Sequence, residues 1–147
     1  MTKIQKFWDR FLNKHSLPNN TVCSDIFSFD ITQKKSNYLL QLVLEEKKTA
    51  TTSLYIEKEF NTRVGEYNIV TTFRGVPKAI IQITDVKILK LKDMTFELAR
   101  LEGEDETFDS WKKTHEEFLS VDAKNYNMTL NENTLIVFEI FKLVYKE

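Results

Sequence analysis

The stretch that most constrains the fold is a hairpin pattern at residues 67–91. Residues 67–73 have the apolar and β-branched composition of a strand, Arg74-Gly75-Val76-Pro77 has the composition of a tight turn, and residues 79–91 form a long β-branched run. Two strands joined by so short a turn pair in antiparallel fashion. The stretch therefore predicts a hairpin-like unit, and the chain as a whole has too few strand-helix alternations for a doubly wound parallel fold.

The remaining elements alternate irregularly between helix and strand. Residues 4–12 predict an amphipathic helix, residues 27–31 a short strand, and residues 38–44 a buried helix capped by Ser36. Further along, Asp93 or Thr95 opens a short helix, residues 108–119 form another helix, and residues 135–145 form a closing strand. This order predicts an α+β fold: a single-domain, small mixed β-barrel decorated by helices, with residues 1–20 as a helical segment packed on a domain of residues 21–147.

Composition limits the classes of function. The 21 basic and 22 acidic residues nearly cancel, so a nucleic-acid site must be a local patch. The single Cys23 cannot form an intrachain disulfide, and no signal peptide is recognisable, which predicts a cytoplasmic protein. No apolar run approaches the ~20 residues that cross a bilayer, so no membrane partner is expected. His15, His115 and Cys23 lack zinc-ligand spacing, and we expect neither a metal nor a cofactor.

A run of lysines and hydroxyl residues, EKKTATTSL, follows the apolar helix at residues 46–54. If the chain is extended beyond Lys48, then Thr49, Thr51 and Ser53 share one face of a strand, opposite Thr52. A lysine desolvated by the neighbouring helix could act as a base, and a threonine could act as a nucleophile or hold a water molecule. The alternative is structural, because lysines complement the dipole of a helix C-terminus and threonines favour strands.

Residues 39–54, LLQLVLEEKKTATTSL, resemble the signature of the ASCH domain, named after the activating signal cointegrator-1 homology region, in its longer bacterial branch. Further matching blocks occur in the same order at residues 75–77, 80–86, 99–105, 111–115 and 138–141. The resemblance spans residues 27–145, which is most of the chain.

This resemblance implies a PUA-like β-barrel with a cleft that receives RNA or a nucleotide. Some small bacterial members are amidohydrolases that remove acyl groups from the N4 amine of cytidine, using a lysine, a threonine three residues later and a downstream glutamate. Other members are linked to RNA binding or cleavage. Carried over to this chain, the resemblance implies Lys48 and Thr51, together with Glu102 or Glu104, depending on which neighbouring block fixes the alignment.

Two aromatic residues complete the candidate site. Trp111 and His115 share a face of the expected helix with Phe118. His115 is either a hydrogen-bonded structural residue or a ligand contact, and Trp111 is either a core residue or a stacking platform for a base. Thr49 and Ser53 could bind the ligand or stabilise an oxyanion.

Three hypotheses remain open from the sequence. The first is an amidohydrolase acting on acylated nucleosides, with ribonuclease activity as another enzymatic possibility. The second is a non-catalytic module that binds nucleotides or short single-stranded RNA through phosphate, base and stacking contacts. The third is a scaffold whose partner is another protein.

Overall fold

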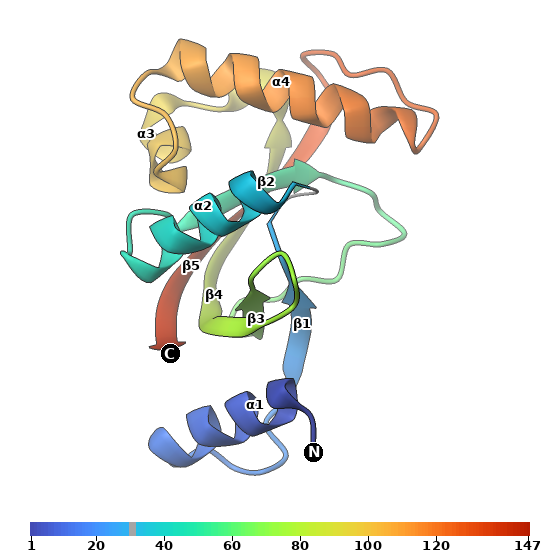
Figure 1. Cartoon of the computed structure of the whole chain (residues 1–147). Coiled ribbons are helices and arrows are strands. Elements are labelled where there is room, and N and C mark those ends of the chain that lie inside the picture. Colours follow the sequence, from blue (N-terminus) through green and yellow to red (C-terminus); the bar gives the residue numbers. More distant parts are fainter. Residues whose placement is uncertain (30–31) are drawn as a thin grey trace.

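The computed structural model describes residues 1–29 and 32–147. Figure 1 shows five strands with helices on either side. The helices are α1 (Lys3–Lys14), α2 (Gln33–Leu44), α3 (Phe96–Ala99) and α4 (Phe108–Lys124), with short 3-10 turns at Leu91–Asp93 and Arg100–Glu102. The strands are β1 (Cys23–Phe27), β2 (Ala50–Leu54), β3 (Tyr67–Thr71), β4 (Pro77–Lys90) and β5 (Leu135–Lys146).

The five strands form one sheet in the order β1-β3-β4-β5-β2. The predicted β3–β4 hairpin is confirmed, and β4 pairs along its length with β5, from Ala79 opposite Lys146 to Lys90 opposite Leu135. Only the β1–β3 pair of the described sheet is parallel. The edge strands β1 and β2 both contribute side chains to one cavity, so the sheet curls into an open barrel. The expected mixed α+β fold is confirmed.

The helices pack against different parts of the sheet. Phe7 and Phe11 of α1 pack against Ile69 and Ile80. The α2 helix, through Leu40 and Val43, packs with Val70, Ile81 and Phe141. Helix α4 and the α3 region form a third apolar cluster, whose buried members include Trp111, Leu119, Ala50 and Phe138. Strand β2 packs with α4 through Ala50, whereas α2 packs on β3, β4 and β5, so the loop between α2 and β2 joins these two packed clusters.

Two predicted boundaries were wrong. The strand expected at residues 27–31 lies earlier, because β1 pairs with β3 from Cys23 opposite Tyr67 to Phe27 opposite Val70, and Phe29 follows the strand. The expected position of Ile31 falls outside the described residues. Helix α2 begins at Gln33 rather than after Ser36, because Thr32 has the extended backbone of a cap and its carbonyl accepts the Ser36 N–H.

None of the helices in the described part of the chain combines the length and apolar character that a bilayer crossing requires.

Candidate functional site

Lys48 is turned inward by the end of α2. Glu46 has a positive φ of 60°, and the N–H groups of both Lys47 and Lys48 donate to the carbonyl of Leu42. The next N–H, that of Thr49, donates to the carbonyl of Leu101, and β2 begins at Ala50, two residues after the lysine. The Lys48 residue is 2% exposed, and its Nζ donates to the Ala50 carbonyl at 2.9 Å.

Gly103 brings two glutamates beside this lysine. It has a φ of 73°, and a Cβ at this position would lie 2.1 Å from the carbonyl oxygen of Lys47. Only glycine allows the loop after Arg100–Glu102 to approach the α2–β2 connection so closely. The approach places Glu102 Oε1 at 3.4 Å and Glu104 Oε2 at 2.8 Å from Lys48 Nζ.

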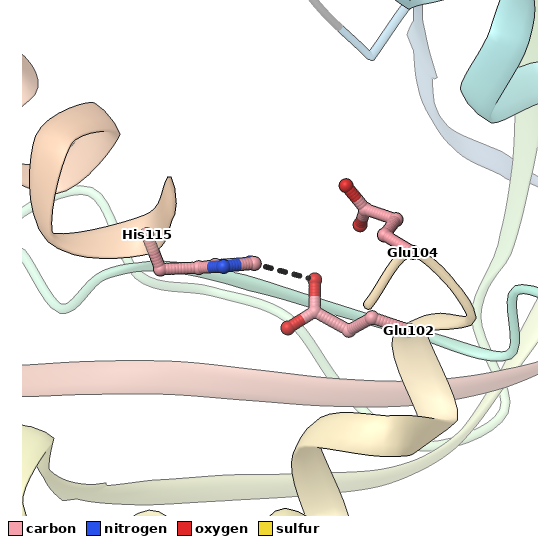
Figure 2. Close-up of side chains that lie close together, drawn as sticks. All are labelled: Glu102, Glu104 and His115. Carbon is pink, nitrogen blue, oxygen red and sulfur yellow. Dashed lines mark hydrogen bonds and ion pairs between the residues drawn. The ribbon is translucent and has the colours of Figure 1, made fainter. Parts of the chain in front are cut away.

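Glu102 is the centre of a buried hydrogen-bond network. One oxygen, Oε2, accepts from Thr52 Oγ1 at 2.8 Å and from Trp111 Nε1 at 2.7 Å. The other, Oε1, lies 3.1 Å from His115 Nε2 and 3.4 Å from Lys48 Nζ (Figure 2 shows the contact with His115). A carboxylate offers about four acceptor positions, so Glu102 is saturated.

The charge state of this network follows from its contacts. Burial alone would raise the pKa of Glu102, but the hydrogen bond from His115 and the charge of Lys48 outweigh burial and lower this pKa to about 2. Burial would likewise lower the pKa of His115, but the hydrogen bond and charge of Glu102 outweigh it and raise that pKa above 6.5. The lowered pKa of Glu102 favours its ionised form, and the raised pKa of His115 favours its protonated form.

Three possible metal ligands meet here, but a cation already lies among them. Ligand atoms of Glu102, Glu104 and His115 all lie within 4.8 Å of one another, and they are the three side chains drawn in Figure 2. Since Lys48 Nζ contacts both glutamates, a metal ion would have to displace a buried ammonium group. These three side chains therefore suit the ammonium group of Lys48 better than they suit a metal ion.

These side chains line a small pocket, here called the lysine pocket, with a volume of about 60 Å³. This space accommodates a few water molecules or a small acyl group rather than a whole nucleoside. Its lining residues are Phe29, Lys35, Leu39, Lys48, Thr51, Thr52, Glu102, Glu104, Thr114, His115 and Phe118.

The structure brings together five of the eight residues proposed from the sequence, namely Lys48, Thr51, Glu102, Glu104 and His115. The other three do not line this pocket. Thr49 Oγ1 donates to the Leu101 carbonyl at 3.0 Å, and Ser53 lines a separate, larger cavity. Trp111 is 1% exposed, and its ring stacks on that of His115 with centroids 4.1 Å apart, so it holds Glu102 and His115 in place and cannot stack on a ligand base.

Sequence reasoning missed several pocket residues. Thr52 lies on the opposite face of β2 from Thr51 and Ser53, yet it makes the direct bond to Glu102. Phe29 lies beneath Lys48, with Nζ 5.4 Å from the ring centroid. Lys35 and Thr114 belong to helices α2 and α4, and only the packing of those helices brings them to the pocket. Phe118, three residues after His115 on the same helix face, is the pocket residue that the sequence spacing did indicate.

Known proteins resemble this chain in both sequence and fold. A family model described as the ASCH domain matches residues 25–145. A crystal structure of an ASCH domain from Lactobacillus crispatus JV V101 is 28% identical, with a TM-score of 0.87 over 97% of this chain and 94% of that one. A crystal structure of a protein from Enterococcus faecalis V583 is 30% identical, with a TM-score of 0.87 over 96% of this chain and 87% of that one. A search of curated proteins gives no match.

Proposed function

Because this chain belongs to the ASCH domain family, which is linked to RNA and nucleotide interaction, we propose that it is an amidohydrolase acting on N4-acylated cytidine-type nucleosides. The observation that carries the proposal is the contact of Lys48 Nζ with Glu104 Oε2 at 2.8 Å, in a pocket that Thr51 also lines. A buried ammonium group, a carboxylate and a hydroxyl are the groups that acyl transfer requires.

Glu104 is the proton carrier in this proposal, and Glu102 is a positioning residue. All acceptor positions of Glu102 are occupied by Lys48, Thr52, Trp111 and His115, and its low pKa keeps it ionised. Among the described residues, Glu104 forms its side-chain hydrogen bond and ion pair with Lys48 alone, and its side chain is 12% exposed against 2% for Glu102. A carboxylate that is partly open to the pocket can exchange a proton with a substrate.

The reaction follows from these positions. A water molecule held by Thr51 attacks the acyl carbonyl carbon, and Glu104 accepts the proton that the water releases. The Lys48 ammonium group stabilises the negative charge that develops on the carbonyl oxygen. Glu104 then returns its proton to the amine nitrogen as the C–N bond breaks, leaving a carboxylic acid and the free amine of cytidine.

Chromatographic detection of product tests this function. The purified protein is incubated with N4-acetylcytidine, and the release of cytidine is followed in parallel for Thr51→Val and for Ser53→Ala, a change on the same face of the same strand. Cytidine formed by the parent and by Ser53→Ala, but not by Thr51→Val, supports the proposal. Absence of cytidine at high protein concentration contradicts it.

A binding module is the second candidate, and two residues of the lysine pocket favour it. Phe118 is 49% exposed and could stack on a base, and the partly buried Lys35 could contact a phosphate. Salt dependence separates the two functions, because phosphate contacts weaken steeply as salt rises whereas turnover of an uncharged nucleoside changes little. Affinity for a short single-stranded RNA that falls with salt, with no cytidine released, would favour binding alone.

A further inference from the structure

A second cavity lies inside the curled sheet and differs from the lysine pocket in the charge of its lining residues. This barrel cavity has a volume of about 630 Å³, within the size range of small-molecule sites. Side chains from all five strands and from the connection before β3 line it, namely Ser24, Asp25, Phe27, Thr51, Ser53, Asn61, Thr62, Glu66, Asn68, Ile81, Ile83, Glu139 and Phe141. Thr51 is the residue that it shares with the lysine pocket.

The barrel cavity has an acidic lining. Asp25, Glu66 and Glu139 line it, and among the residues that the structure describes no lysine, arginine or histidine does. In the described ranges, 1–29 and 32–147, none of the three carboxylates forms an ion pair. Burial, and then the charges of Glu66 and Asp25, raise the pKa of Glu139 to about 6. The cavity is therefore a region of unbalanced negative potential, which repels phosphate groups.

An unpartnered acceptor lies in the wall of the same cavity. Asn68 is only 6% exposed, and its buried Oδ1 has no hydrogen-bond partner among the described residues. Asn68 lies opposite Asp25 on β1 and Ile81 on β4, both of which also line the cavity. Because buried acceptors are nearly always hydrogen-bonded in folded proteins, this oxygen is available to accept a hydrogen bond from a donor that enters the cavity.

We propose that the barrel cavity binds a small organic cation through a protonated primary amine. An ammonium group carries three donors and one positive charge: a donor can bond the Asn68 oxygen, and the charge offsets the negative potential of the three carboxylates. The apolar side chains of Ile81, Ile83 and Phe141 offer contact surface to the carbon chain of such a ligand. This assignment does not depend on the function proposed for the lysine pocket.

A metal ion fits the barrel cavity less well than an organic cation. Within the described residues, the acidic and histidine side chains whose ligand atoms gather within 4.8 Å are Glu102, Glu104 and His115, and the three acids of the barrel cavity do not form such a group. Ca²⁺ requires its oxygen ligands at about 2.3–2.6 Å. Carboxylates spread around a cavity of 630 Å³ act on a cation through their summed charge, whereas a metal ion needs several oxygen ligands in direct contact.

Calorimetric titration with n-butylammonium chloride at pH 7.5 and constant ionic strength tests the proposal. We expect saturable binding to the parent, no binding of n-butanol, and affinity about tenfold lower in Glu139→Gln and in Asn68→Leu, because each change removes one partner of the ammonium group. Glu97→Gln, at an exposed acid outside the cavity, is the matched control and should bind like the parent.

Acid should weaken this binding, because Glu139 gains a proton as the pH falls through about 6 while the alkylammonium stays charged. The groups whose charges act on Glu139 are Asp25 and Glu66, and an adjoining pocket that also includes Glu139 contains Glu59, Asp122 and Tyr126.

Far-ultraviolet circular dichroism establishes that each variant is folded, and Glu66→Gln serves as a second cavity variant. Equal affinity for n-butanol, equal affinity of Glu139→Gln and Glu97→Gln, or saturable binding of Ca²⁺ without that of n-butylammonium would each overturn the proposal.

Discussion

The carboxylate of Glu104 lies 2.8 Å from the ammonium group of Lys48, although 56 residues separate them in the chain. Two features make this contact possible. The backbone at residues 46–49 turns Lys48 inward directly after α2, and Gly103 lets the loop that carries Glu104 pass against the carbonyl of Lys47. The candidate site is thus a junction of two loops, which each depend on a backbone conformation with positive φ.

Trp111→Phe tests the hydrogen bond to Glu102. The change keeps an aromatic ring beside His115 but removes the Nε1–H that donates to Glu102 Oε2 at 2.7 Å. We expect the free energy of unfolding to fall by about 1–3 kcal/mol, because a buried charged acceptor loses a donor. Urea unfolding followed by circular dichroism measures the loss. Unchanged stability would mean that this hydrogen bond does not hold Glu102.

Gly103→Ala should be more destabilising than Gly75→Ala. Both glycines have positive φ, 73° and 88°, so an alanine at either position costs about 1–2 kcal/mol of backbone strain. A Cβ at Gly75 meets nothing within 4 Å, whereas a Cβ at Gly103 would lie 2.1 Å from the Lys47 carbonyl oxygen. Urea unfolding of the two variants compares them, and equal losses would contradict the close approach of the two loops.

Because of the Glu102–His115 pair, we expect the free energy of unfolding to decrease both at acidic pH and at alkaline pH. The pKa of Glu102 falls from 4.5 to about 2 on folding, so its contribution is present above pH 4.5 and is lost as the pH falls toward 2. The pKa of His115 rises above 6.5 on folding, so its contribution is present below pH 6.5 and is lost as the pH rises through the folded value.

His115→Gln isolates this effect. Urea unfolding between pH 5 and pH 9 should show that the parent loses more stability than the variant as the pH rises, because the variant has no imidazolium to lose. If the free energy of unfolding depended on pH in the same way for both proteins, the pKa of His115 would not change on folding.

Glu139→Gln should stabilise the protein at neutral and alkaline pH. Folding raises the pKa of Glu139 from 4.5 to about 6, so the ionised carboxylate opposes folding above that range. Removing it should increase the free energy of unfolding by about 1–2 kcal/mol at pH 8, with little change at pH 4, where the acid is protonated in both states. A variant less stable than the parent at pH 8 would show that Glu139 forms a stabilising contact.

Local patterns predicted most of the fold. The β3–β4 hairpin and helices α1 and α4 have strong periodicity or turn signals in the sequence, whereas an extended chain after Lys48 was only one possibility there. The start of α2 and the position of β1 could not be predicted, because they depend on the cap at Thr32 and on parallel pairing with β3, which is distant in the chain.

Only the part of the candidate site that lies in two short family-like segments could be predicted from the sequence. The resemblance of residues 39–54 and 99–105 identified Lys48 and the two glutamates, but the separate roles of Glu102 and Glu104 depend on Thr52, Trp111 and His115, which reach Glu102 through tertiary packing. The acidic barrel cavity joins residues of five strands, and no local pattern in the sequence indicates it.

Steady-state kcat/KM for N4-acetylcytidine in the parent, Glu104→Gln and Glu106→Gln tests most directly whether Glu104 carries the proton. Glu106 is an exposed acid two residues further along the same loop and does not line the lysine pocket, so it is the matched control. We expect Glu104→Gln to lower kcat by about 10²–10⁴-fold and Glu106→Gln to match the parent, because only Glu104 carries the proton. Equal activity of Glu104→Gln and the parent, or no turnover by any of the three proteins, would contradict this expectation.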